Sequence, residues 1–385
     1  MKWKEYSLDE LINIKHGYAF KGEFFSEEPT DDILLTPGNF AIGGGFKAQK
    51  LKYYNGDFPV DYILDENDVI VTMTDLSKEA DTLGFSAKVP AWYGKRFLHN
   101  QRIGLVKLKT DDFDKDYLYW LMRTFSYQRF VANGATGATV KHTSPTKICQ
   151  YKFTAPDDKT TQRKIASILS AYDDLIENNL KRIKLLEEKA SLMYKLMQKE
   201  LSDVEKINLY DFANIQMGFA FKAEAFNVEG EGIPIIRIRD IPAQMTKSHT
   251  TQEVDNQYWV EKGDLLIGMD GEFHMNEWLG QRGYLVQRVC RLRAKNELYQ
   301  SYLWQALKEP IHYYETTISG ATVAHLGKKH LEEIFIASPK DSMKNELEEM
   351  NVMRKLKIVL AEQNTKLREA RDILLPKLMN GQIEV

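Results

Sequence analysis

The chain repeats one series of short motifs, and this repeat constrains the possible folds more than any other feature. Segments of the first half recur in the same order in the second half. The matching pairs are 16–21 with 217–222, 68–73 with 264–269, 101–103 with 287–289, and 137–142 with 320–325. The separation between partners shrinks along the chain, so the second copy has shorter loops on a similar framework. Two copies of a scaffold with variable loops are typical of a protein that binds through those loops.

Each copy has the pattern of a mixed α and β domain. Short β-branched or aliphatic runs predict strands at 68–73, 103–108, 233–238 and 289–292. Apolar residues spaced by three and four predict one helix at 117–131 and another at 298–314. Ser144 followed by Pro145 predicts a further helix start with the serine as its cap. The expected fold class is therefore α+β, with two mixed α/β domains.

A long helix is predicted after the first copy, from 162 to about 199. Its core positions alternate spacings of four and three, which is the seam of a coiled coil. At 1.5 Å per residue this helix would extend roughly 57 Å. Asn179 is a polar residue in the seam, and we predict that it fixes the register of the helix pair. The seam consists of Ile165, Leu169, Tyr172, Ile176, Asn179, Ile183, Leu186, Ala190, Met193 and Met197.

A second long helix is predicted after the second copy, from 342 to about 379. Pro376 and Gly381 predict that this helix kinks or ends near its last turn. The simplest arrangement packs the two long helices antiparallel as a coiled coil, which relates the two domains by a pseudo-two-fold axis. A homodimeric coiled coil is the alternative. The less regular seam of the second helix runs through Met353, Leu356, Leu360, Gln363, Leu367, Ala370 and Leu374.

The predicted domain organisation has four parts. We place the first domain at 1–157, the central helix at 158–202, the second domain at 203–340 and the C-terminal helix at 341–385.

Composition and charge exclude several classes of protein. The formal net charge of −3 argues against binding DNA through bulk charge, so any DNA contact must be local. Cys149 and Cys290 lack a CxxC spacing or a nearby histidine set, which argues against a disulfide framework and a zinc site. The sequence predicts neither a signal peptide nor a membrane span, and we expect a cytoplasmic protein.

Catalytic motifs are also missing from the sequence. It contains neither the Asn-Pro-Pro-aromatic motif nor the glycine-rich cofactor loop of an adenine methyltransferase, nor the GxxxxGK[ST] loop of an ATPase. Asp264, Asp270 and Glu272 lie close together in the sequence, without the lysine-bearing pattern of a nuclease centre. We therefore predict no catalytic residues, no metal ligands and no cofactor.

Two segments carry a resemblance to a known family. Residues 374–383, Leu-Leu-Pro-Lys-Leu-Met-Asn-Gly-Gln-Ile, resemble the C-terminal signature of type I restriction-modification specificity subunits. Residues 162–179, which open with Gln-Arg-Lys-Ile, resemble the central conserved helix of that family, with Tyr172 where Leu is more usual. The resemblance extends over essentially the whole chain. The second helix departs from the family pattern at 338–343, which lacks the Gln-Arg-Lys-Ile opening. The surface on which this helix would bind a partner subunit is therefore not expected to be fully symmetric with that of the first helix.

The resemblance implies a division of labour. Two target recognition domains would read the two halves of a split double-stranded DNA sequence. The paired helices would set the spacer between the halves and dock two methyltransferase subunits, and restriction subunits that translocate DNA would join them. The chain itself would be non-catalytic. It would confer DNA specificity on an adenine-N6 methyltransferase and ATP-dependent endonuclease complex that serves in phage defence.

Candidate DNA-contacting residues combine phosphate anchors with side chains able to reach base edges. In the first domain they are Lys47, Gln49, Lys50, Lys52, Arg102, Thr139, Lys141 and His142. In the second domain they are Arg237, Arg239, Lys247, His249, Arg282, Arg288, Thr322 and His325. For each lysine and arginine among them, the alternative is a loop side chain that is merely solvated. Recurrence in both copies favours a framework role for Gln101-Arg102 and Gln287-Arg288.

Two other functions stay open at this point. The first is an adaptor whose paired helices only gather partner proteins, which a specific DNA footprint would exclude. The second is an unrecognised nuclease, which would cleave DNA in a metal-dependent way as the purified chain.

Overall fold

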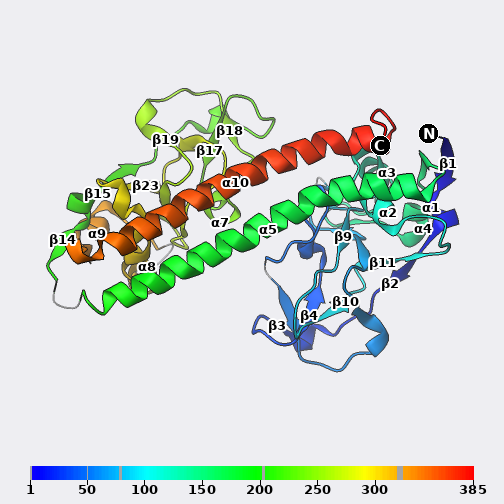
Figure 1. Cartoon of the computed structure of the whole chain (residues 1–385), viewed down its shortest axis with the longest axis horizontal. Coiled ribbons are helices and arrows are strands. Elements are labelled where there is room, and N and C mark those ends of the chain that lie inside the picture. Colours follow the sequence, from blue (N-terminus) through cyan, green and yellow to red (C-terminus); the bar gives the residue numbers. More distant parts are fainter. Residues whose placement is uncertain (1, 50, 78–79, 202–203, 319–323) are drawn as a thin grey trace. The chain divides into compact units, whose positions relative to one another are not determined.

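The computed structural model describes residues 2–49, 51–77, 80–201, 204–318 and 324–385 (Figure 1). The chain divides into two compact units. Unit 1 comprises Met1–Asp174 and Arg368–Val385, and unit 2 comprises Leu175–Leu367. Both divisions fall inside the long helices, so they do not test the four-part domain organisation, which stays a prediction.

Unit 1 contains, over its described residues, a four-stranded and a five-stranded sheet. The four-stranded sheet has the order β2 (Ile12–His16), β11 (Ile103–Leu108), β7 (Val69–Thr72), β9 (Ser86–Lys88). The five-stranded sheet has the order β3 (Phe25–Ser26), β5 (Lys52–Tyr54), β4 (Asp32–Leu35), β10 (Arg96–His99), β6 (Ile63–Leu64). Two smaller pairs join β1 (Trp3–Ser7) to β13 (Lys152–Pro156) and β8 (Thr74–Asp75) to β12 (Lys141–His142).

Unit 2 repeats the strand order of both larger sheets. Its four-stranded sheet has the order β15 (Ala213–Met217), β23 (Val289–Ala294), β20 (Leu265–Gly268), β21 (Met275–Glu277). Its five-stranded sheet has the order β16 (Phe226–Asn227), β18 (His249–Thr250), β17 (Ile233–Ile236), β22 (Gly283–Leu285), β19 (Trp259–Val260). The remaining pair joins β14 (Lys206–Asn208) to β24 (Phe335–Ala337). The repeat in the sequence is therefore a repeat of the fold, and the α+β prediction is confirmed.

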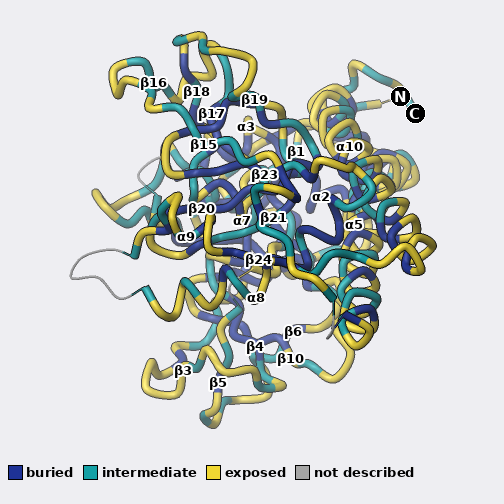
Figure 2. Tube along the Cα trace, turned by 90° about the vertical axis from the view of Figure 1, so that its left-hand side faces the viewer, coloured by how far each residue is buried: buried dark blue, intermediate teal, exposed yellow. Residues whose placement is uncertain are grey.

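The predicted central strands are confirmed with small shifts at their ends. Strand β7 has the sequence Val-Ile-Val-Thr and is buried along its whole length. Strand β20 of unit 2 is also buried along its whole length (Figure 2). Continuous burial explains why these strands carry aliphatic residues on both faces, since neither face meets water.

Short helices complete each unit. Unit 1 has α1 (Leu8–Leu11), α2 (Lys115–Leu121), α3 (Phe125–Asn133) and α4 (Pro145–Cys149), and unit 2 has α6 (Leu209–Phe212), α7 (Asp240–Ala243), α8 (Gln300–Thr317) and α9 (Lys328–Glu332). Ser144 caps α4 by accepting a bond from the Lys147 amide, as predicted. Single turns of 3-10 helix lie at Gly22–Phe24, Pro37–Asn39, Val60–Tyr62, Ala223–Ala225, Asn256–Tyr258, Glu297–Tyr299 and Asp341–Met343.

The single helix predicted at 117–131 is wrong, because two helices occupy this segment. Helix α2 ends at Leu121, and Thr124 adopts an extended conformation with φ −73° and ψ 148°. The Thr124 hydroxyl accepts a bond from the Tyr127 amide and so caps α3. The apolar spacing continues across residues 122–124, between α2 and α3, because each of the two short helices buries apolar side chains.

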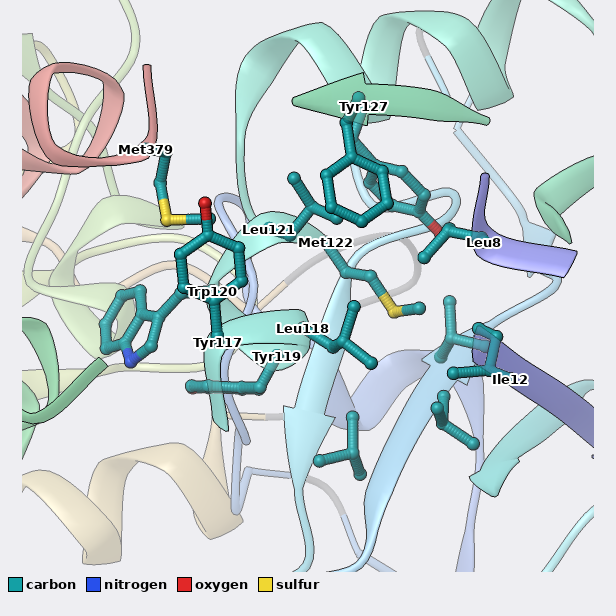
Figure 3. Close-up of a cluster of buried hydrophobic side chains, with 14 of the residues drawn as sticks. Leu8, Ile12, Tyr117, Leu118, Tyr119, Trp120, Leu121, Met122, Tyr127 and Met379 are labelled. Atoms are coloured by element: carbon teal, nitrogen blue, oxygen red, sulfur yellow. The ribbon is translucent and has the colours of Figure 1, made fainter. Parts of the chain in front are cut away.

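The core of unit 1 forms around these two helices. Tyr117, Leu118 and Trp120 of α2 pack with Tyr127 of α3, and Met379 lies in the same cluster (Figure 3). Leu8 and Ile12 complete the cluster from the start of the chain. Trp120 is fully buried, and its indole N–H donates to the Ser170 hydroxyl at 3.0 Å. Residues far apart in the sequence therefore share one core.

The two long helices are α5 (Lys159–Gln198) and α10 (Lys344–Met379), each continuous over its whole length (Figure 1). All ten predicted seam residues of α5 are buried or half-buried, so that prediction is confirmed. Helix α10 continues through Pro376 and ends at Met379, and Gly381 follows with φ +78°. In the described part of the chain no helix is long and apolar enough to cross a membrane.

The helices pack antiparallel within each unit. In unit 2, Asn179 donates to Asn364 at 3.0 Å, and Lys189 pairs with Glu349 at 2.5 Å. As residue numbers rise along α5, those of its partners on α10 fall. Asn179 is buried by this contact, which is the environment that a register-fixing residue requires.

The seam predicted for α10 is wrong at two positions. Leu356 and Gln363 are exposed, whereas the neighbouring Lys357 and Asn364 are buried. Lys357 is buried because its ammonium group lies 3.0 Å from Glu187 and 2.9 Å from Glu277. At the first position, apolar periodicity favours Leu356 over Lys357, since a paired polar residue carries no hydrophobic signal. At the second position both neighbours are polar amides, so apolar periodicity does not distinguish Gln363 from Asn364.

Candidate nucleic-acid interface

The repeated glycines at the start of each copy are required by a close approach of the backbone. A Cβ atom on Gly17 would lie 2.1 Å from the Asn100 carbonyl oxygen, and one on Gly218 would lie 2.0 Å from that of Val286. The residues after these glycines bond to the opposite segment in the same way, because Gln101 donates to the Tyr18 carbonyl and Gln287 to that of Phe219. The same framework therefore positions Arg102 and Arg288.

In unit 1 this framework brings Arg102 and His142 to one place. The Met73 amide donates to the Arg102 carbonyl at 3.0 Å, and the Thr143 amide donates to the Met73 carbonyl at 3.0 Å. The His142 ring nitrogen Nδ1 lies 3.2 Å from the Thr74 hydroxyl. Arg102 and His142 are both exposed. We call Thr74, Arg102 and His142 the first cluster.

In unit 2 the equivalent bonds bring Arg288 and His325 together. The Met269 amide donates to the Arg288 carbonyl at 2.8 Å, and the Leu326 amide donates to the Met269 carbonyl at 2.8 Å. Asp270 stands at the place of Thr74, and its Oδ1 lies 2.6 Å from Nδ1 of His325. We call Asp270, Arg288 and His325 the second cluster. Sequence reasoning named both arginines and both histidines as DNA contacts, but it missed Thr74 and considered Asp270 only for a nuclease centre.

The second cluster borders a depression of about 290 Å³ in unit 2. Arg288 adopts a left-handed backbone conformation with φ +74°, which costs a residue with a side chain about 1–3 kcal/mol. Strain of this kind persists only where the surroundings enforce it, and it gathers at functional sites. The depression is lined by Met217, Gly218, Met269, Gln287, Arg288, His325 and Lys328.

The other candidates of unit 1 lie apart from the first cluster or at its edge. Lys47 and Gln49 are exposed in the loop before β5, and Lys52 is exposed on β5, with its ammonium group 6.0 Å from the centre of the Phe25 ring. Thr139 is exposed before β12, and Lys141 is half-buried within it. Among the described residues, no hydrogen bond connects the side chain of Lys47, Gln49 or Lys52 to Arg102 or His142. Lys50 lies outside the described residues.

Several candidates of unit 2 have partners within the protein. Arg237 donates to the Ser248 hydroxyl, and burial lowers the pKa of its guanidinium group. Arg282 lies 2.7 Å from Glu261 and stacks 3.9 Å from the centre of the Trp259 ring. Arg239 and Lys247 are exposed, His249 is half-buried on β18, and Thr322 lies outside the described residues.

The carboxylates considered for a nuclease centre are not brought together as one site. Asp264 pairs with Arg293 at 2.7 Å, whereas Glu272 pairs with His274 at 3.2 Å and Asp270 belongs to the second cluster. Within the residues that the structure describes, no group of three or more His, Cys, Asp or Glu side chains could hold a metal ion.

Buried charges attach each globular domain to the long helices, and sequence reasoning did not find them. In unit 1, Asp173 of α5 pairs with Arg123 and with Arg371 of α10, each at 2.5 Å. Burial alone would raise the pKa of Asp173, but the two guanidinium groups hold it below its ordinary value. In unit 2, Glu277 of β21 pairs with Arg354 at 2.5 Å as well as with Lys357. These contacts fix each domain against the helix segments of its own unit.

A comparison with protein families decides where the chain belongs. The family model for the type I restriction modification DNA specificity domain matches residues 1–188 and matches again at residues 201–347. The chain belongs to this specificity family. The two matches coincide with the two copies of the repeated topology, so each unit carries one specificity domain.

Curated relatives bear the same family name. The type I restriction enzyme EcoBI specificity subunit of Escherichia coli is 33% identical over 135 residues, which are 35% of this chain and 28% of that protein. The MjaIX specificity subunit of Methanocaldococcus jannaschii is 21% identical over 305 residues, which are 70% of this chain and 69% of that protein. The match to the EcoBI subunit thus spans little more than a quarter of its length.

A solved structure has the same fold as this specificity-family chain. The crystal structure of the type I restriction-modification S subunit from M. genitalium superposes with a TM-score of 0.57 at 18% identity. The match covers 98% of this chain and 96% of that one.

Proposed function

We propose that this chain is the sequence-specific DNA-binding specificity subunit of a type I restriction-modification complex, and that its two domains read the two halves of a split target. The observation that carries the proposal is the double match to the specificity-domain family, one match for each copy of the fold. Two equivalent exposed clusters, each with an arginine and a histidine, support it. Such side chains bind phosphates and base edges.

The predicted DNA-contacting residues are part of this proposal. A chain with a net charge of −3 binds DNA through local groups. The exposed Lys47 and Gln49 of the loop before β5 and Lys52 of β5 provide such groups on unit 1, and Arg239 and Lys247 do so on unit 2. In the proposal these residues act as phosphate and base contacts in addition to the two clusters.

The long helices are the proposed docking site for two methyltransferase subunits and the element that sets the spacer. Large apolar side chains remain exposed on both helices of unit 2, away from the seam that joins them. In the proposal they contribute to a surface that binds another protein, since contiguous exposed apolar patches mark such surfaces. They are Leu175, Leu180, Leu185, Leu192 and Leu196 on α5, and Val352, Leu356 and Val359 on α10.

Catalysis is assigned to the partners in this proposal. The chain would confer specificity on an adenine-N6 methyltransferase, and restriction subunits would add ATP-dependent cleavage. An adaptor without DNA specificity is the competing function, since it would use the same exposed helix faces.

The test is to co-express the chain with its methyltransferase subunit in a host without other adenine methylation, and to map methylated adenines by single-molecule sequencing. We expect a split motif, with two short defined halves separated by a fixed gap. A stable complex that methylates no defined motif would contradict DNA reading and favour the adaptor. A motif with one defined half would contradict reading by both domains.

A further inference from the structure

The first and second clusters occupy equivalent places in the repeated fold but differ in charge. Thr74 is neutral, whereas Asp270 is a carboxylate that lies 3.4 Å from Nε of Arg288. Among the described residues, the Arg102 guanidinium group has no ion-pair partner. Within the part of the chain that the structure describes, the positive charge of the first cluster is therefore not paired with a carboxylate, whereas Asp270 compensates the charge of the second cluster.

Asp270 fixes the orientation of both of its partners. An ionised carboxylate only accepts hydrogen bonds, so Nδ1 of His325 must carry the proton that bonds to Oδ1 over 2.6 Å. The Arg288 terminal nitrogen lies 3.3 Å from Nε2 of the same ring. The left-handed backbone at Arg288, with φ +74°, adds a further constraint. The second cluster is thus arranged before any ligand arrives.

This difference in charge selects different parts of DNA. A phosphate is attracted to Arg102 but is repelled by the carboxylate beside Arg288. A base edge is neutral and offers acceptors to an arginine and an amino donor to an aspartate, as at guanine O6 and N7 and at cytosine N4. Asp270, Arg288 and His325 keep between 34% and 50% of their side-chain surface exposed, so a base edge can reach them.

We propose that the second cluster reads a base pair in one half of the target, and that the first cluster anchors a phosphate in the other half. Residue 270 acts as a positioning residue in this scheme, because it aims Arg288 and His325. The residue type at the equivalent positions 74 and 270 then determines whether the cluster specifies a base or only binds the backbone. This inference rests on the proposed DNA-reading function.

The experiment measures DNA binding by the complex with its methyltransferase subunit, as a function of salt and of single base changes in the mapped motif. For Asp270→Thr we expect the complex to discriminate about 10- to 100-fold less between the correct and a changed base pair at one position of one half of the motif. The slope of log K against log[salt] should steepen by about 0.9, as one more phosphate is neutralised. Thr74→Asp should make the slope shallower by about 0.9 and leave the recognised bases unchanged.

Glu272→Gln is the matched control, because Glu272 lies two residues from Asp270 and pairs with His274 outside the cluster. It removes one negative charge and should leave every recognised base unchanged. A folded Asp270→Thr complex with the base preferences and salt slope of Glu272→Gln would overturn the inference. If Asp270→Thr does not fold, the same measurements on Asp270→Asn and Thr74→Asp test the inference. Asp270→Asn keeps the shape of the side chain and removes its charge. A wild-type complex without any motif would instead overturn the proposed function.

Discussion

At the scale of single residues, the histidine that ends β10 makes the stability of unit 1 depend on pH. His99 is fully buried in unit 1, and its Nε2 lies 2.8 Å from the Ile103 carbonyl oxygen. Burial lowers the pKa of His99 to about 4. In the unfolded chain a histidine takes up a proton near pH 6.5, so acid favours unfolding between pH 6.5 and 4, and no such effect acts above pH 6.5.

We predict that the free energy of unfolding of unit 1 decreases by up to about 3 kcal/mol from this residue as the pH is lowered from 7 to 4. Chemical unfolding of wild type and His99→Gln at pH 7 and pH 5 measures the effect. The variant should show a smaller loss at pH 5 than wild type does. Equal losses in both proteins would mean that His99 does not carry this pH dependence.

Recurrence explains which residues of the clusters could be predicted from the sequence. Arg102 and Arg288 recur, as do His142 and His325, and all four were predicted. Thr74 and Asp270 differ in type, so a comparison that looks for identity passes over them, although they directly follow the matched Met73 and Met269. The importance of Asp270 depends on its contact with His325, 55 positions away, and such a contact has no local signal in the sequence.

At the scale of elements, the long helices combine apolar seams with buried polar contacts. The apolar seam of α5 was predictable because its residues repeat at coiled-coil spacing. On α10 the buried polar residues Lys357 and Asn364 interrupt that spacing, and their burial follows from partners on other elements. Periodicity therefore predicted that α10 exists and roughly where it ends, but not which face it buries in its middle.

Lys357 provides the test of these buried contacts. Lys357→Met removes one of the two cationic partners of the buried Glu277 and a partner of the half-buried Glu187. Because Glu277 keeps its pair with Arg354, we expect unit 2 to lose about 1–3 kcal/mol of stability. Lys355→Met is the matched control, because Lys355 is exposed and its surface pair with Glu297 is long, at 3.9 Å. The control should change stability by less than about 0.5 kcal/mol. Denaturant unfolding of both variants measures the change in the free energy of unfolding. Equally small changes in the two variants would show that the Lys357 pairs contribute little to stability.

At the scale of the whole molecule, the repeat predicted the fold class and the presence of two similar units. It could not predict that the compact units divide within α5 and α10, because that division depends on which helix segments each domain contacts. The two units share one topology, and each has its own cluster and its own buried contacts to the helices. In the proposed function, each domain reads one half of the target independently of the other.

Independent reading by the two domains is tested most directly by mapping the methylated motif of two variants, each with changes in one domain. One replaces Lys47, Gln49 and Lys52 of unit 1 by alanine, and the other replaces Arg239, Lys247 and His249 of unit 2. We predict that each variant weakens or blurs a different half of the motif and leaves the remaining half and the gap unchanged. Independent reading would be contradicted if changes in a single domain blurred both halves of the motif. It would also be contradicted if the two variants blurred the same half.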